Sequence, residues 1–170
     1  MLTPQHVANY FLERAARENR GLSPIKLLKL VYIGYGWYLA LTGEKLFAEN
    51  IQAWQHGPVI PSLYHEFKHY RSNAIDEYST VFDLDSFEEQ TPRVPSSSQE
   101  AMVLEKVWES YKRFSGWALR DKTHQPDSPW SAVYKQGKQN IKIPDDKIEA
   151  HFQERIGLYL DAAKSPEPAE

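Results

Sequence analysis

The apolar residues of the N-terminal quarter recur at helical spacing. Thr3 followed by Pro4 marks a helix start, because a Thr hydroxyl can cap free backbone N–H groups and Pro suits the first helical position. The spacing continues to Gly21, which we expect to end this helix. Ser23–Thr42 has the same kind of start and is apolar on nearly every face, as expected of a helix inside a core. The pattern therefore predicts a domain arranged around one buried helix.

Two glycines, Gly34 and Gly36, interrupt this second helix. Glycine weakens a helix, but its missing side chain lets two backbones come nearer. We therefore expect another helix to cross the buried helix closely at these two positions.

The rest of the chain is mostly helical in pattern. Extended segments are expected at 46–55 and at 78–82. A turn at His56, Gly57 and Pro58 should follow the first, and residues 83–98 are expected to form an exposed loop. A further helix is expected at 61–71. Another should begin at a capping box formed by Ser97 and Glu100 and stop at Gly116. Two more should begin at Ser128 and at Pro144.

The predicted fold class is therefore mainly α (α+β). We expect a single compact helical domain at 1–164, built around the central buried helix, with a small antiparallel β element near Ile51 or Tyr78. The polar, Pro-containing residues 165–170 are expected to form a flexible tail.

Composition narrows the chemistry that the chain can perform. The 170 residues include no Cys, which excludes disulfides, a thiolate nucleophile and Cys-ligated metal. Twenty Lys and Arg stand against 23 Asp and Glu, so the basic excess typical of nucleic-acid binding is missing and direct DNA binding is not expected. The patterns of serine nucleophiles and phosphate-binding loops are also absent. We expect a protein that is not an enzyme.

The apolar stretch 25–41 raises the question of a membrane span. It contains Lys26, Lys29 and two glycines, which fits a buried core helix better than a transmembrane helix. The first residues show no basic segment followed by an apolar run, so no signal peptide is expected. A cytoplasmic protein without membrane contact is the expectation.

One motif offers an enzymatic alternative. His65, Glu66 and His69 spell H-E-x-x-H, which on a helix can hold zinc with the Glu as general base, as in a zinc metallopeptidase. A third ligand would have to come from the glutamates at 88–89 in the predicted loop, and Lys68 would place a cation beside the metal. We favour the alternative in which these residues form the solvent side of a helix, and we expect no metal and no cofactor.

Two groups of residues are candidates for recognition. Lys26 and Lys29 lie one helical turn apart and are expected to leave the core on the same side, where they could meet acidic groups of a partner or form an ordinary solvated edge. Trp54 and His56 belong to a rigid turn that could serve recognition or could be a structural corner.

Several segments together resemble the Panacea domain of bacterial antitoxins. The similarity spans roughly residues 5–160, and its most specific part runs from Ile51 through the His56-Gly-Pro turn to Pro61. The segments that carry it are 26–32, 36–39, 43–47, 51–61, 63–70, 107–111, 119–130 and the closing helix around Phe152.

This resemblance implies an antitoxin, encoded beside a toxin gene and often carried by prophages, that neutralises the co-encoded toxin by direct protein–protein binding without catalysis. It leaves open the alternative of a proteolytic adaptor that delivers a toxin to a cellular protease. Partners would be the cognate toxin and, for an adaptor, that protease. We expect the partner-binding residues to be Lys26, Lys29, Trp54, His56, Tyr64 and Trp130.

The zinc alternative is tested by changing both His65 and His69 to Ala. We expect nearly unchanged stability and unchanged toxin neutralisation, because exposed polar positions contribute little to either. Thermal unfolding, growth rescue and elemental analysis would be measured together. A variant that loses both bound zinc and function would contradict the expectation.

Overall fold

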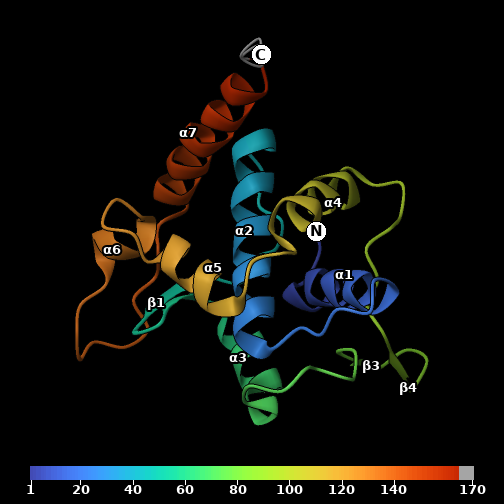
Figure 1. Ribbon diagram of the computed structural model, residues 1–170. Helices are drawn as coiled ribbons and strands as arrows, with labels where there is room; N and C mark the ends of the chain where they lie inside the picture. Colours follow the sequence, from blue (N-terminus) through green and yellow to red (C-terminus); the bar gives the residue numbers. More distant parts are fainter. Residues whose placement is uncertain (165–170) are drawn as a thin grey trace.

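A computed structural model describes residues 1–164, so the predicted tail at 165–170 lies outside the described residues. Within them the chain forms seven α-helices, one short 3-10 helix and two β-hairpins (Figure 1). The helices are α1 (Pro4–Arg17), α2 (Pro24–Thr42), α3 (Pro61–Phe67), η1 (Lys68–Tyr70), α4 (Gln99–Tyr111), α5 (Gly116–Thr123), α6 (Pro129–Val133) and α7 (Asp145–Lys164). The strands are β1 (Gln52–Trp54), β2 (Gly57–Val59), β3 (Val81–Asp83) and β4 (Glu88–Gln90).

The helix α2 lies at the centre of the molecule. In Figure 1, α1 and α4 lie on one side of it and α5 and α6 on the other, and α2 makes its most extensive contacts with α7, α5, α4 and α1. Every residue from Leu27 to Leu39 is buried. The predicted mainly α fold around a central buried helix is confirmed. No helix among residues 1–164 is long and apolar enough to cross a membrane.

The two glycines of α2 mark close crossings, as predicted. A Cβ atom on Gly34 would stand 2.8 Å from the Leu104 side chain of α4. A Cβ atom on Gly36 would overlap the ring of Phe152 on α7. The close packing of α2 against α4 and α7 therefore requires glycine at these positions.

The end of α1 differs from the prediction. The helix ends at Arg17, and Asn19 takes a left-handed backbone with φ 53°, a conformation that Asn tolerates better than most residues. The Arg20 N–H then donates to the Ala15 carbonyl. Gly21 does not cap the helix. Its missing side chain leaves room for Ala74, because a Cβ atom on residue 21 would lie 3.1 Å from the Cβ atom of Ala74.

Two predicted helix boundaries in the second half are also wrong. Ser98 and not Ser97 caps α4, because its side chain accepts a hydrogen bond from the Ala101 N–H. Gly116 begins α5 instead of ending α4, and Ser115 caps the new helix. Gly116 is needed there for packing, since a Cβ would stand 2.5 Å from a methyl group of Ile25 on α2.

The first hairpin pairs β1 with β2 in antiparallel register. The chain turns at Gln55 and His56, so the expected turn residues Gly57 and Pro58 belong to a strand. Residues 141–143 extend the sheet on the other side of β1, because the Ala53 N–H donates to the Ile141 carbonyl at 2.8 Å. The hairpin is thereby held between α2 and the segment that precedes α7.

In the second hairpin, β3 overlaps the extended segment expected at 78–82, whereas β4 lies in the segment expected to be a loop. The two ends of this hairpin are held by Asn9 of α1, which is fully buried. The Asn9 amide donates to the carbonyls of Ser79 at 2.9 Å and Pro92 at 3.0 Å and accepts from the Ser79 N–H at 2.8 Å. One side chain therefore joins both stems of the segment 79–92 to the core.

Changing Asn9 to Ala should remove these three hydrogen bonds and leave buried backbone groups unpaired. We expect a loss of about 2–4 kcal/mol in the free energy of unfolding, measured by denaturant titration. Hydrogen exchange should increase across 79–92. Changing the exposed Asn73 to Ala is the matched control, and equal stability of the two variants would contradict the assigned role of Asn9.

Candidate binding surface

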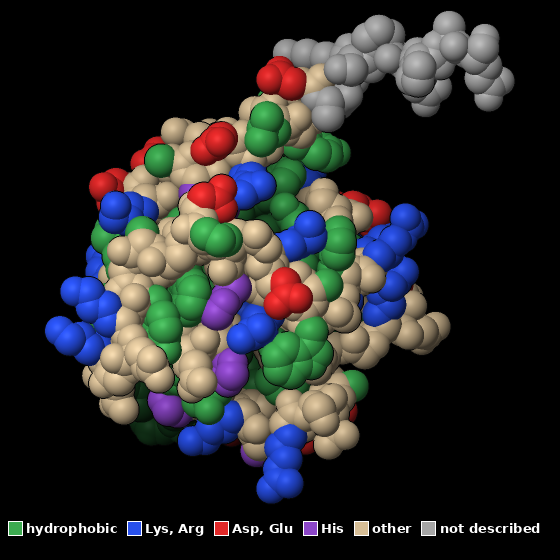
Figure 2. Space-filling view, turned by 60° about the vertical axis from the view of Figure 1, so that its left-hand side comes forward, with side chains coloured by type: hydrophobic (Ala, Val, Ile, Leu, Met, Phe, Trp, Pro, Cys, Tyr) green, Lys and Arg blue, Asp and Glu red, His purple; other side chains and the backbone are tan. Residues whose placement is uncertain are grey.

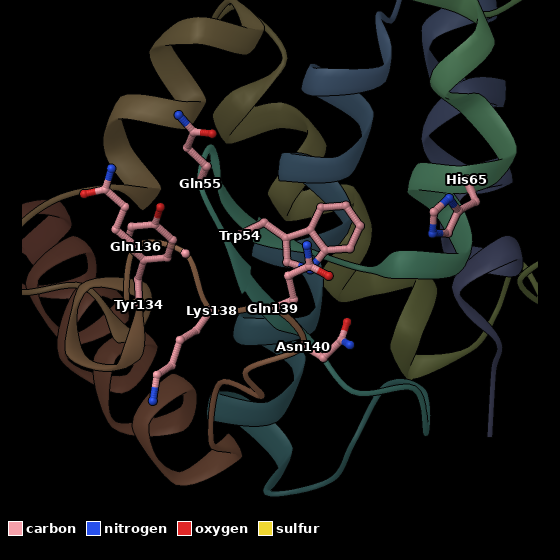
Figure 3. Close-up of a pocket in the computed structure, with 9 residues that line it drawn as sticks. Trp54, Gln55, His65, Tyr134, Gln136, Lys138, Gln139 and Asn140 are labelled. Carbon is pink, nitrogen blue, oxygen red and sulfur yellow. The ribbon is translucent and has the colours of Figure 1, made fainter.

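The hairpin β1–β2 separates two hollows on one face of the molecule. Trp54 and Gln55 line both of them. The larger hollow, of about 510 Å³, is bounded by His65, Tyr134 and the loop 136–140, and Figure 3 shows the Trp54 side chain between His65 on one side and this loop on the other. We call it the Tyr134 hollow.

The second hollow, of about 390 Å³, is more apolar. Its floor comes from Ile25 and Leu28 of α2 and Val59 of β2, and its walls include Tyr64 and Trp117. We call it the Trp117 hollow. Trp117 at its wall is 62% exposed and Tyr64 is 37% exposed, so two large aromatic side chains are available to a partner.

Lys29 does not leave the core, contrary to the prediction. Its side chain is 2% exposed, and its Nζ atom donates to the Pro58 carbonyl at 2.9 Å. The hairpin closes over the amine so tightly that a Cβ on Gly57, whose φ is 111°, would stand 2.8 Å from Nζ. Lys29 therefore holds β2 to α2. Burial, with a smaller effect from nearby Arg120, lowers the pKa of Lys29 to about 7.

Lys26 takes a different direction and is half-buried. Its Nζ atom donates to the carbonyl of Lys112, the residue that caps the C-terminus of α4. A cation is favourable there, because the helix dipole places partial negative charge at this end. Lys26 and Lys29 thus bind two different elements and do not leave the core on the same side, contrary to the expectation.

Trp130 supports the hairpin from the side of α6. Its side chain is 8% exposed, and its indole N–H donates to the Trp54 carbonyl at 2.6 Å. Its ring stacks between His124 at 3.5 Å and Tyr134 at 4.6 Å between ring centroids. The Nε2 atom of His124 lies 3.0 Å from the carbonyl oxygen of Gln55. Burial lowers the pKa of this histidine.

Of the predicted residues, Trp54, His56 and Tyr64 remain at the surface. All three line the Trp117 hollow, and the rings of Trp54 and Tyr64 meet edge to face at 4.8 Å. The tertiary structure thus brings together side chains from β1, the hairpin turn and α3.

The H-E-x-x-H segment does not lie on one continuous α-helix. α3 ends at Phe67, and His69 belongs to η1. The His65 ring lies 6.2 Å from Trp54, whereas the His69 ring lies 4.2 Å from Tyr70. Within residues 1–164, no group of three His, Asp or Glu side chains could hold a metal ion.

Trp117, which lines the Trp117 hollow, was not among the residues predicted from the sequence, because a helix was expected to stop at Gly116. Lys68 and Arg71 also line this hollow, whereas the sequence pattern places Lys68 only on the solvent side of a helix. The signal that could have located Trp117 is the Ser115 cap directly before a short helical segment.

Comparison with known proteins gives two matches. Residues 27–131 match the family described as antitoxin SocA-like, Panacea domain. The protein named Antitoxin SocA from Caulobacter vibrioides (strain NA1000 / CB15N) is 28% identical over 151 residues, which cover 86% of this chain and 80% of that protein. No solved structure shows a significant match.

The buried amine of Lys29 predicts a pH dependence of stability. Below pH 7 the amine is protonated in both the folded and the unfolded chain, so the cost of burying its charge is fully present. Above pH 7 the folded chain loses this proton, whereas the unfolded chain keeps it up to the ordinary pKa of 10.5. The free energy of unfolding should therefore rise with pH from 7 towards 9.5, by up to about 1.4 kcal/mol per pH unit.

Denaturant titrations at several pH values would measure this rise. Changing Lys29 to Met should abolish it, while changing the exposed Lys106 to Met should leave it in place. If the free energy of unfolding rose with pH equally in the Lys29→Met variant and in the unmodified protein, Lys29 would not be the source of the rise.

Proposed function

The chain belongs to the Panacea-domain family of SocA-like antitoxins, and we propose that it is an antitoxin that neutralises a co-encoded protein toxin by binding it directly, without catalysis. The match to this family at residues 27–131 is the observation that carries the proposal. The matched segment holds most of α2, the hairpin β1–β2, α3, α4 and α5. Apart from Pro24 and Ile25, the residues that line the Trp117 hollow all lie within this matched segment.

The face around β1–β2 has the composition of a protein-binding surface. Trp and Tyr are enriched among the residues that contribute most to protein–protein affinity, especially where they lie in or beside pockets. Here Trp54, Tyr64 and Trp117 gather at one hollow. Figure 2 shows hydrophobic and histidine side chains together in the middle of this face, with Lys and Arg side chains among and beside them.

The affinity that a neutraliser needs also favours such a face. Holding a toxin at low concentration requires a Kd of roughly 1 nM, or about −12 kcal/mol. Interfaces of this strength commonly bury about 1,600 Å² around a few anchor residues. Scattered surface charges contribute too little, at about 0–1 kcal/mol per exposed pair.

The packing divides five of the six predicted partner-binding residues into two roles, whereas Lys26 binds the carbonyl of Lys112 at the end of α4. Trp54, His56 and Tyr64 are proposed to contact the toxin directly, because they line a hollow that is open to a partner. Lys29 and Trp130 are proposed to act indirectly, since each holds the hairpin in place through a hydrogen bond to its backbone.

The test is co-expression of this chain with the protein encoded in the neighbouring reading frame. Expression of that protein alone should arrest growth, and the pair should restore growth and co-purify. Changing Tyr64 to Ala should weaken the complex by about tenfold or more, since anchor residues typically contribute above 1 kcal/mol, while the protein stays folded. Changing the exposed Tyr78 to Ala is the control.

The half-life of the toxin in the cell separates neutralisation from proteolytic delivery. Neutralisation by binding predicts that the toxin persists while growth is restored. Rapid loss of the toxin would instead show the adaptor mechanism. Growth arrest that persists, together with the absence of any complex, would reject the antitoxin proposal.

A further inference from the structure

The Trp117 hollow combines an apolar lining with positive charge. Lys29 lies at its base, and Lys68 and Arg71 lie at its wall after α3. His56 and Gln55 supply its other polar groups. Among the described residues that line it, none carries a carboxylate. A ligand that fills the hollow therefore meets apolar carbon and cationic nitrogen together.

The cations behind this lining have little internal compensation. Lys29 donates to the Pro58 carbonyl, and among the described residues it forms no ion pair. Arg120 lies near it, and the buried Nε atom of Arg120 has no hydrogen-bond partner in the described structure. The guanidinium pairs with the carboxylate of Asp121 at 3.4 Å between Nη1 and Oδ1, and the Asp121 side chain is 70% exposed.

A buried cation without a carboxylate partner raises the local electrostatic potential, and low-dielectric walls concentrate that potential in the hollow. Carboxylates of a partner would be attracted to this site. The lining cations that a partner can reach, Lys68 and Arg71, come from η1 and the residue that follows it, so the accessible positive charge is spread over two side chains. This spread fits several side-chain carboxylates better than one terminal carboxylate.

We propose that the Trp117 hollow receives a segment of the toxin in which a bulky apolar side chain is flanked by aspartate or glutamate side chains. The inference rests on the proposed antitoxin function and names the chemistry of the partner. The apolar side chain packs between Trp117, Tyr64 and the floor residues Ile25 and Leu28. Its flanking carboxylates pair with Lys68 and Arg71.

A second copy of this chain carries a segment of the same chemistry, and it is the competing occupant. The β3–β4 hairpin exposes Phe82 by 57%, Leu84 by 75% and Phe87 by 75%. Asp83, Asp85, Glu88 and Glu89 lie among them in the sequence. The experiment must therefore separate toxin binding from self-association.

The principal variant reverses both exposed cations, Lys68→Glu with Arg71→Glu. Its matched control reverses two exposed cations of the α4 region, Lys106→Glu with Arg113→Glu, and makes the same change in net charge. Thermal unfolding confirms that both proteins are folded. The principal variant should bind the co-encoded toxin roughly tenfold more weakly and fail to restore growth, since two attractive pairs become repulsive. The control should behave as the unmodified protein.

A second pair of variants tests the apolar part of the hollow. Changing Trp117 to Ala should also weaken toxin binding about tenfold or more. Changing Met102 to Ala, at a side chain that is 64% exposed, should have no effect. Toxin binding that is unchanged in both the Trp117 and the charge-reversal variants would overturn the inference while leaving the antitoxin function in place.

A peptide probe tests the hollow independently of the toxin. The probe is a labelled peptide, acetylated and amidated, with a Phe-Leu pair flanked by two aspartates on each side; its comparison peptide carries asparagines. The aspartate peptide should bind about tenfold more tightly, and high salt or the charge reversal should remove the difference. Equal binding of the two peptides would overturn the proposed chemistry.

Two further outcomes identify a different occupant. If the aspartate peptide binds through Lys68 and Arg71 but the unmodified protein neither binds the toxin nor restores growth, the antitoxin function fails and the toxin is rejected as the occupant. If sedimentation shows self-association that the charge reversal abolishes, a second copy occupies the hollow and the inference is overturned.

Discussion

Burial of α2 on every side is the constraint on which the rest of the structure depends. A helix that is apolar all round cannot rest against one layer, so other helices must cover it from several directions. Its glycines set how closely two of these can approach, because Gly34 faces Leu104 of α4 and Gly36 faces Phe152 of α7. The positions of α4 and α7, and of the segment that leads into α7, follow from this packing.

The same constraint gives a structural role to a residue type that is usually at the surface. Lys29 lies inside the buried part of α2, and a buried amine needs a hydrogen-bond acceptor. The Pro58 carbonyl supplies it, so satisfying this amine fixes β2 against α2. Trp130 fixes β1 in a comparable way through the Trp54 carbonyl. The hairpin is therefore held from two sides, which keeps Trp54 in place beside Tyr64 of α3.

A hairpin held by these two hydrogen bonds beside two hollows supports the proposed binding of a protein partner. Preformed aromatic anchors lose little conformational entropy when they bind, and this raises affinity for a given contact area. The charges of the molecule are also separated. Cations lie at the Trp117 hollow, whereas the β3–β4 segment, held to the core by Asn9, carries carboxylates and exposed apolar side chains. The two regions therefore differ in surface chemistry.

The sequence by itself determined the mainly helical fold, the start and end of α2, the close crossings at its glycines, and the resemblance that identifies the family. Helical periodicity, caps and missing side chains are local features, so they can be read without a structure. Tertiary structure alone decided the direction of Lys29, the burial of Trp130 and the place of Trp117. Each of these depends on which carbonyl or ring another element brings into reach, and residues far apart in the chain supply those groups.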